Sequence, residues 1–335
     1  MLALSNSSHP QLHPASCITK SFSKCMLHRC YFSYILLFLF LSPQVRRTLF
    51  GVLLTVYLAI LLGNILLILI FISDRTLHIP MYILVCGLAV LDIVITTNTV
   101  PSMLILFSFE YRVVPFAACF TQTMFWVGLF STECFLLALM AYDRYMAICN
   151  PLHYPNLMSN SHVSKLMAGC WVAGFLSATP SVGLVLSLSF CGPNEINHCF
   201  CDFGSLLFLA CGDNQITNYA ILIIGLTVLF IPLAFILFSY VRIIFSISSK
   251  EGRMKAFYTC GTHMLVICVF FLTAAGVFIS DRIPFASVDA RILGLVVRNV
   301  FPALLNPIIY CLRTKQIRNC LVKMLKKIKV LPDRR

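Results

Sequence analysis

The sequence predicts an all-α membrane protein: a seven-transmembrane helix bundle with a short amphipathic eighth helix on the cytoplasmic side. Three observations support this prediction. The 335 residues are 59% hydrophobic and only 11% charged, against about 25% charged residues in a typical soluble domain. Seven stretches reach the length of about 20 mostly apolar residues that a helix needs to cross a bilayer. Lysine and arginine gather on one side of these stretches.

The composition also excludes other classes of protein. The mean hydropathy is +0.91, and a folded domain of this size cannot bury so much apolar surface from water. A soluble globular enzyme and a disordered protein are therefore excluded. The phosphate-binding, zinc-protease, nucleophile-elbow and dinucleotide-binding motifs are absent from the sequence, so we expect no enzyme.

The seven predicted spans follow one another with short connections. Four carry no charged residue, and the other three carry one each: Asp92, Glu133 and Arg298. The spans are residues 48–73, 80–109, 113–142, 166–194, 214–241, 256–280 and 292–312. An earlier apolar run, residues 31–41, is too short to cross and indicates a signal-like or interfacial segment.

The chain accordingly divides into three parts. Residues 1–47 form an N-terminal tail, residues 48–312 the transmembrane domain, and residues 313–335 the amphipathic helix and C-terminal tail. No linker is long enough to join a second domain. The tail contains Asn6 in an Asn-Ser-Ser triplet, which is a glycosylation acceptor if this tail is lumenal.

The basic residues predict the orientation. Of 25 lysines and arginines, 16 follow the first, third, fifth or seventh span, whereas three lie in the opposite loops and five in the N-terminal tail. Basic residues favour the cytoplasmic side, so the C-terminus is expected inside the cell and the N-terminus outside, although the five tail residues count against this. The protein is expected in the plasma membrane as a multi-pass protein.

The segment after the last span has the pattern of a helix that lies on a membrane. Apolar residues recur at three- and four-residue spacing through residues 314–331, and lysines and arginines lie largely off that stripe. Such a helix binds the anionic lipids of the cytoplasmic leaflet, and Cys311 and Cys320 are candidate palmitoylation sites. This basic face accounts for most of the net charge of +13, so no nucleic-acid partner is needed to explain it.

Charged residues inside a bilayer are costly, which makes each one a functional candidate. Asp92 and Glu133 lie within the second and third spans, and Asn64 and Asn306 within the first and seventh. Facing one another, they could form a hydrated pocket for Na⁺ or a proton, and no other cofactor is expected. They could equally form a neutral, hydrogen-bonded carboxyl pair that only packs helices.

Two motifs end spans at the expected inner face. Asp143-Arg144-Tyr145 ends the third span, where Arg144 can pair with its neighbour or release it, as a two-state switch requires. Alternatively, Arg144 is an ordinary interfacial arginine. In the seventh span, Pro307 removes a helix hydrogen bond and permits a kink that could let Tyr310 swing inward. Alternatively, this is a kinked helix with an interfacial tyrosine.

Together these motifs resemble the rhodopsin-like (class A) G-protein-coupled receptors, and more narrowly the odorant (olfactory) receptors, over roughly residues 41–323. The specific motifs are LHIPMY (77–82), MAYDRYMAIC (140–149), KAFYTCGTH (255–263) and PALLNPIIY (302–310). The resemblance implies a receptor that binds a small volatile odorant and activates a stimulatory heterotrimeric G protein, raising cyclic AMP. The implied switch residues are Asp143, Arg144, Tyr145, Asn306, Pro307 and Tyr310.

The chain also departs from the family's pattern. Residues 1–33 do not resemble its short glycosylated N-terminus, which leaves open a non-signalling or poorly delivered, pseudogene-like receptor. Phe271 and Leu272 stand where the family usually has Tyr-Gly, which removes a hydroxyl and adds bulk near the expected ligand floor. A small-solute transporter is a weaker alternative, because the sequence shows neither paired broken helices nor an inverted repeat.

Cysteines cluster in the loop between the fourth and fifth spans, which is expected to be extracellular and oxidising. The resemblance implies two disulfides, Cys119–Cys201 and Cys191–Cys211, which leave Cys199 over. We expect no metal site here, because His198 and the nearby cysteines fit no standard zinc spacing and disulfides compete for the sulfurs.

The ligand pocket is expected among the outer halves of the third, fifth and sixth spans. Counting along the third span from Arg144 places Trp126, Phe130 and Ser131 at pocket depth, with Phe271 and Ala274 at comparable depth in the sixth. The lining is aromatic and apolar, without the acid that amine receptors carry in the third span, which favours a small, weakly polar ligand. Any one of these residues could instead only pack helices.

Overall fold

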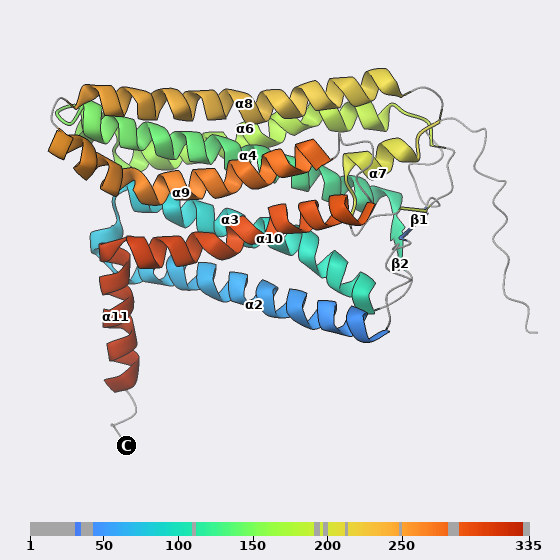
Figure 1. Ribbon diagram of the computed structural model, residues 1–335, viewed down its shortest axis with the longest axis horizontal. Helices are drawn as coiled ribbons and strands as arrows, with labels where there is room; N and C mark the ends of the chain where they lie inside the picture. The colour runs from blue at the N-terminus through green and yellow to red at the C-terminus, as the bar shows by residue number, and fades with distance from the viewer. Residues whose placement is uncertain are drawn as a thin grey trace, which may run out of the picture.

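The computed structural model describes residues 31–34, 43–108, 112–190, 195–196, 200–211, 214–247, 250–280 and 288–330. Within them, seven long helices run beside one another and form an elongated bundle (Figure 1). Asn6, Cys191, Cys199 and the signal-like residues 35–41 lie outside the described residues.

The seven long helices correspond to the seven predicted spans, so the predicted fold is confirmed. They are α2 (Pro43–Ser73), α3 (Pro80–Ser108), α4 (Phe116–Cys149), α6 (Asn160–Leu186), α8 (Gln215–Ser246), α9 (Lys250–Ser280) and α10 (Val288–Arg313). Each is long and apolar enough to span a membrane. Large apolar side chains such as Leu62, Leu176 and Phe230 are exposed on the outer surface, where lipid rather than water would cover them.

Several helices extend beyond the apolar stretches that predicted them. α4 continues to Cys149 and α8 to Ser246, while α9 begins at Lys250, and all three extensions lie at the same end of the bundle. The prediction stopped where polar residues began, but a helix satisfies its backbone hydrogen bonds internally and can continue into water. At the other end α6 stops at Leu186, eight residues before the predicted boundary.

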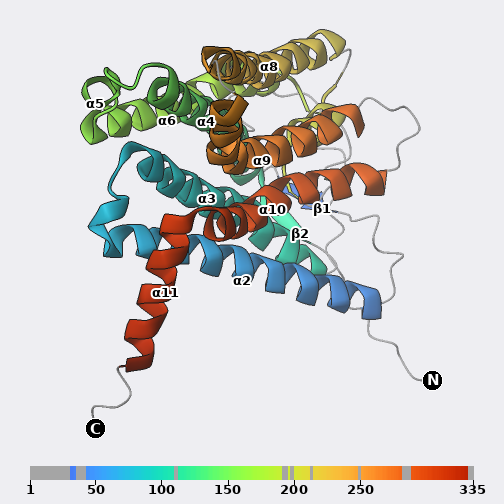
Figure 2. The ribbon, with the colours of Figure 1, turned by 60° about the vertical axis from the view of Figure 1, so that its left-hand side comes forward.

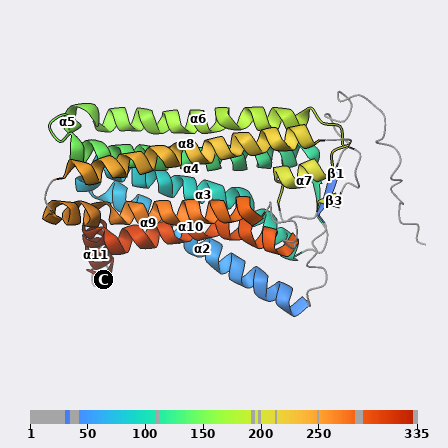
Figure 3. The ribbon, with the colours of Figure 1, turned by 45° about the horizontal axis from the view of Figure 1, so that its top comes forward.

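Short elements occupy the two ends of the bundle. One end carries η2 (Arg75–Leu77), α5 (Tyr154–Leu157) and α11 (Lys315–Val330), and we call it the α11 end. The opposite end carries α7 (Phe203–Phe208) and a small sheet, and we call it the sheet end. The views in Figures 1 and 3 agree that these two ends lie at opposite extremes of the bundle.

The sheet has three short strands in the order β2-β1-β3. Its central strand, β1 (Tyr31–Tyr34), pairs antiparallel with β2 (Arg112–Pro115) and parallel with β3 (Glu195–Ile196). The N-terminal segment is thereby joined to the loops that follow α3 and α6. The first residues of the short apolar run predicted as signal-like or interfacial thus form a strand, because they find pairing partners far along the chain.

The predicted amphipathic helix forms as α11, which leaves α10 and crosses the direction of the long helices (Figure 2). Its apolar face is anchored to the bundle, since Ile317 and Cys320 are buried. The Cys320 thiol donates a hydrogen bond to Asp74 Oδ2 at 3.1 Å, next to η2. Palmitoylation, for which the sequence makes Cys320 a candidate, would require its sulfur to leave this contact.

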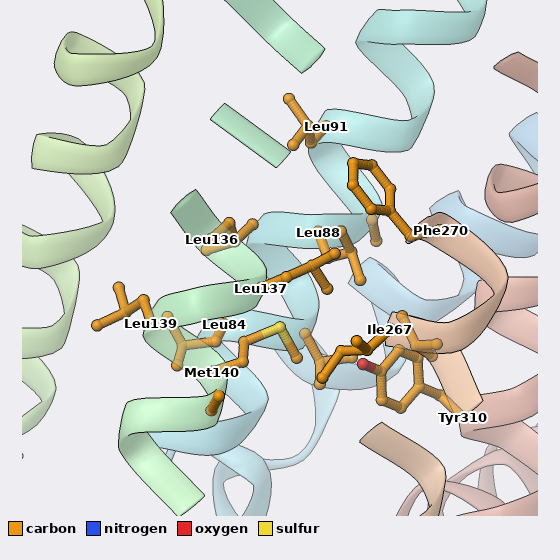
Figure 4. Close-up of a cluster of buried hydrophobic side chains, with 14 of the residues drawn as sticks. Leu84, Leu88, Leu91, Leu136, Leu137, Leu139, Met140, Ile267, Phe270 and Tyr310 are labelled. Atoms are coloured by element: carbon orange, nitrogen blue, oxygen red, sulfur yellow. The ribbon is translucent and has the colours of Figure 1, made fainter. Parts of the chain in front are cut away.

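A tightly packed group of apolar side chains fills the bundle between its middle and the α11 end. We call it the apolar layer; it comprises Leu84, Leu88, Leu136, Leu137, Met140, Ile267 and Tyr310 (Figure 4). These side chains come from α3, α4, α9 and α10 and face one another. The layer separates two sets of polar residues, one in the middle of the bundle and one at the α11 end.

Candidate functional site

The four polar residues predicted inside the membrane are all buried within the bundle. Asn306 Nδ2 of α10 donates a hydrogen bond to Asp92 Oδ2 of α3 at 2.9 Å. Asn64 Nδ2 of α2 donates to the backbone carbonyl of Ala303 in α10 at 3.0 Å. Three helices are therefore joined by buried hydrogen bonds, which a lipid environment makes costly to leave unmade.

The bond from Asn64 has a specific cause in the sequence. A helix carbonyl normally accepts the N–H of the residue four positions on, and Pro307 has no N–H to give to the carbonyl of Ala303. Asn64 supplies the missing donor from the neighbouring helix. The residue before it is Gly63, where an added Cβ would lie 3.0 Å from Pro307 Cγ, so the close approach of α2 to Pro307 favours glycine there.

Glu133 has a partner that sequence reasoning did not assign to it. Arg298 Nη2 of α10 donates to Glu133 Oε2 of α4 at 3.1 Å, and the two side chains are only 5% and 2% exposed. Asp92 and Glu133 therefore bond different residues rather than each other. The signal was present in the sequence, because Arg298 is the one charged residue of the seventh span and a charge in lipid needs a partner.

Two aromatic rings enclose this ion pair. The guanidinium carbon of Arg298 lies 4.9 Å from the ring centre of Phe130 and 4.5 Å from that of Phe270. The two rings come from α4 and α9 and lie 5.8 Å apart, nearly parallel. A cation over the faces of desolvated rings is attracted by their negative faces, so the rings stabilise the charge as well as excluding lipid and water.

A second arginine pair lies at the α11 end. Arg144 donates to Asp143 Oδ2 through Nη2 and, at 3.0 Å, through Nε. The other carboxylate oxygen, Oδ1, accepts a hydrogen bond from the Tyr154 hydroxyl of α5 at 2.8 Å. Burial and the neighbouring Asp143 carboxylate raise the pKa of Tyr154, which keeps this hydroxyl protonated as a donor. Tyr145 packs against the edge of the buried core.

The predicted switch tyrosine already lies inside the bundle. Tyr310 is buried in the apolar layer, and its side chain points toward Ile267 in Figure 4. Among the described residues its hydroxyl has no hydrogen-bond partner. Nearby, the Tyr240 hydroxyl of α8 lies 2.5 Å from His263 Nδ1 of α9, which joins these two helices on the α11 side of the layer.

Two of the predicted pocket residues form an aromatic cluster. Trp126 stacks on Phe130 with ring centres 6.3 Å apart, and Trp126 Nε1 donates to Asn299 Oδ1 of α10 at 2.9 Å. Phe200, from the loop between α6 and α8, is fully buried against Trp126 with ring centres 5.9 Å apart. The hydroxyl of Ser131 donates to the Val127 carbonyl of its own helix.

The other two predicted pocket residues lie in α9. Phe271 and Ala274 are both buried, but Phe270 is the residue that stacks on Phe130. Phe271 packs edge-on against Phe270, with ring centres 5.0 Å apart. Sequence reasoning missed Phe270 because counting residues fixes depth along a helix but not the direction in which each side chain points.

A disulfide and a hydrogen bond hold the loop between α6 and α8 next to the Trp126–Phe130 cluster. Cys119 of α4 and Cys201 form a disulfide, the pairing that the resemblance implied, with Cα atoms 5.3 Å apart. Next to it, the Cys201 backbone N–H donates to Gln122 Oε1 at 3.1 Å. Cys211 is also disulfide-bonded. In the described part of the chain, no group of three or more histidine, cysteine or acidic side chains could hold a metal ion.

Comparison with known proteins identifies the family. The olfactory receptor family model matches residues 53–328. The chain belongs to the olfactory receptor family. Among curated olfactory receptors, human olfactory receptor 10A3 is 36% identical over 298 residues, covering 88% of this chain and 95% of the relative. Human olfactory receptor 10R2 is 39% identical over 287 residues (85% of each chain), and mouse olfactory receptor 5AR1 is 38% identical over 293 residues (85% and 93%).

The fold of this olfactory receptor is shared with a solved structure. The crystal structure of squid rhodopsin aligns with a TM-score of 0.68, covering 84% of this chain and 81% of that chain at 18% identity. The protein is therefore a multi-pass membrane receptor with the seven-helix fold of the G-protein-coupled receptors, and it is not an enzyme. The transporter alternative finds no support in these comparisons.

Proposed function

We propose that this receptor binds a small, volatile, weakly polar odorant beside the Trp126–Phe130 cluster and then activates a stimulatory heterotrimeric G protein, which raises cyclic AMP. The observation that supports the proposal is the ion pair between Arg144 and Asp143. Its carboxylate partner, Asp143, belongs to the same helix, so the pair can open without separating two helices. An arginine held in this way can be exchanged between Asp143 and a partner protein.

The orientation that this function needs follows from the basic residues. The α11 end carries Lys315 and the other lysines and arginines of α11, and these favour the cytoplasmic side. With that end inside the cell, Arg144 faces the G protein and the Cys119–Cys201 disulfide lies in the oxidising exterior. The proposed location is the plasma membrane, with the N-terminus outside.

The chemistry of the aromatic cluster supports the class of ligand. The cluster consists of aromatic rings and has few polar groups. Two of these, the Trp126 indole N–H and the Asn299 amide oxygen, already form a hydrogen bond with each other. Glu133 is the nearest carboxylate on α4, but Arg298 neutralises it, so a cationic amine finds no free counter-ion there. Such a lining favours an apolar ligand with weak polar groups.

The proposed signal passes along α9. Phe270 belongs to the aromatic cluster and Ile267, three residues earlier on the same face of the helix, belongs to the apolar layer. An odorant that binds better when α9 has shifted away from α4 favours that state in proportion to its difference in affinity. The shift loosens the apolar layer and opens the α11 end beside Arg144.

The test is odorant-stimulated cyclic AMP in cells, scored at equal surface level over a panel of volatiles. We expect a dose-dependent rise that Arg144→Ala abolishes and that Arg75→Ala, an exposed arginine at the same end, leaves unchanged. A normal response from Arg144→Ala would overturn the switch. Silence with full surface display would contradict the stimulatory coupling or the ligand class, and silence without display would support the alternative of a poorly delivered receptor.

A further inference from the structure

The middle of the bundle holds two buried acidic side chains, Asp92 of α3 and Glu133 of α4. Buried carboxylates are stable only when they are paired with a cation, protonated or well hydrogen-bonded. Na⁺ is the cation that the sequence suggested for this place. A hard cation needs several oxygen atoms directed at it, so the question is where the oxygens and the donors of this site point.

The Glu133 carboxylate is already occupied by a positive charge from the protein itself. Arg298 Nη2 donates to Oε2 at 3.1 Å, and the ring centres of Phe130 and Phe270 lie 4.9 Å and 4.5 Å from the guanidinium carbon. Arg298 is 4% exposed as a whole residue, so the charge cannot be satisfied by bulk water. Glu133 is the acidic partner of Arg298, and removal of either charge would leave the other one buried alone.

The two asparagine amides of the site direct their donors at oxygen atoms of the protein, while Asn64 Oδ1 and Asn306 Oδ1 are buried and have no hydrogen-bond partner among the described residues. Asn306 turns Nδ2 toward the Asp92 carboxylate, and Asn64 turns Nδ2 toward the Ala303 carbonyl. Asp92 is thereby stabilised by a neutral donor, while Glu133 is stabilised by a cationic one. A Na⁺ ion placed between the two carboxylates would meet the guanidinium of Arg298 as a like charge.

We infer that Arg298 is a built-in cation that takes the place of Na⁺ between α4 and α10, so that the receptor is insensitive to Na⁺. The residues present do not fit a bound sodium ion, because the positive charge that the carboxylates require is covalently part of α10. Unlike a dissociable ion, this charge is present at every salt concentration. The inference is independent of the odorant and of the G protein.

The test is thermal unfolding of the purified receptor in NaCl and in KCl at equal ionic strength. For the wild type we expect the same melting temperature in both salts. Arg298→Leu removes the built-in cation and leaves the carboxylates free to bind Na⁺. For this variant NaCl should raise the melting temperature by about 2–4 °C relative to KCl, the shift that modest ligand binding produces in a protein of this size.

Matched variants separate the charge from the shape of Arg298. Arg298→Lys keeps a cation and should remain indifferent to the choice of salt. Arg298→Gln keeps a hydrogen-bond donor but loses the charge, and it replaces Arg298→Leu if the latter does not fold. Asp92→Asn added to the neutral variant should abolish the new Na⁺ effect.

Two outcomes would overturn the inference. One is a Na⁺-specific rise in the melting temperature of the wild type. The other is a folded, uncharged variant at position 298 that melts at the same temperature in both salts. Neither measurement involves odorant or G protein, so failure here is distinguishable from failure of the proposed function.

Discussion

Two arginines of this receptor bind carboxylates in opposite ways, and the difference separates a movable contact from a fixed one. Arg144 pairs with Asp143, the preceding residue of the same helix, whereas Arg298 pairs with Glu133 of another helix, 165 residues away in sequence. Both carboxylates belong to α4, where ten residues correspond to about 15 Å along the axis. One helix thus carries a pair that can open alone and a pair that cannot open unless α4 and α10 separate.

The surroundings of the two pairs reinforce this contrast. The Arg144 side chain is 14% exposed and lies where α4 leaves the apolar layer, whereas Asp143 is only 1% exposed, so water can reach the guanidinium but not the carboxylate. Arg298 is enclosed by aromatic rings and has no such substitute. A guanidinium that water can reach has a substitute partner when its pair opens, whereas opening a pair with both members buried leaves two charges without one.

The largest effect is expected from breaking the buried pair. Glu133→Gln leaves the Arg298 guanidinium buried without a counter-ion, which should lower the free energy of unfolding by about 3–5 kcal/mol. Arg298→Leu should be comparably harmful, but the double variant should recover most of the loss, because no charge is then left alone. Denaturant unfolding of the four proteins in detergent measures the coupling. Additive losses in the double variant would contradict the pairing.

A smaller effect on stability, but a clear effect on signalling, is expected at the movable pair. Asp143→Asn removes the charge that holds Arg144 and should raise basal cyclic AMP by about fivefold, which corresponds to about 1 kcal/mol in a two-state equilibrium. Tyr154→Phe removes only the hydrogen bond to Asp143 and should raise basal cyclic AMP less than Asp143→Asn does. Unchanged basal signalling of Asp143→Asn at equal surface display would show that this pair does not restrain the receptor.

The smallest effect concerns a third carboxylate, Asp74, which bonds neutral donors instead of an arginine. Hydrogen bonds from Thr76 and then from Cys320 lower the pKa of Asp74. A carboxyl group whose pKa is lower in the folded state stabilises the fold at neutral pH, and this contribution is lost as acidification carries the pH through the lowered pKa. Asp74→Asn should therefore reduce the acid sensitivity of the contact between α11 and η2.

The same variant should change the reactivity of the thiol. Burial, followed by the Asp74 carboxylate, raises the pKa of Cys320. Without that carboxylate the pKa falls, and alkylation of Cys320 should accelerate by less than about tenfold, the change that one pKa unit makes in the thiolate fraction. Site-resolved mass spectrometry after brief maleimide treatment measures this rate. Slower labelling than in the wild type would contradict the assigned contact, and Cys311 serves as the internal reference.

The sequence predicts some of these features and not others for physical reasons. The seven spans were predictable because lipid excludes charge from long stretches, a constraint that acts locally along the chain. The partner of Arg298 was not predictable, because the pairing depends on how α4 and α10 are rotated about their axes. The same reason explains why Phe270 rather than Phe271 stacks on Phe130: neighbouring helix positions point in directions about 100° apart.

The strand β1 illustrates a different limit. Local propensity says little about Tyr31–Tyr34, because a four-residue strand is stable only with partners, and these lie at residues 112–115 and 195–196. The apolar character of the segment was visible in the sequence, but its register was not. Pairing across such long separations is fixed only once the bundle has brought the loops together.

The position of β1 has a consequence for how the receptor is made. A chain is synthesised from its N-terminus, so β1 emerges from the ribosome well before β2 and long before β3. Its antiparallel partner β2 follows α3, whereas its parallel partner β3 is translated only after α4 and α6. Completion of the sheet is thus a late step of biosynthesis, and a chain begun after Tyr34 would leave β2 and β3 without the strand that joins them.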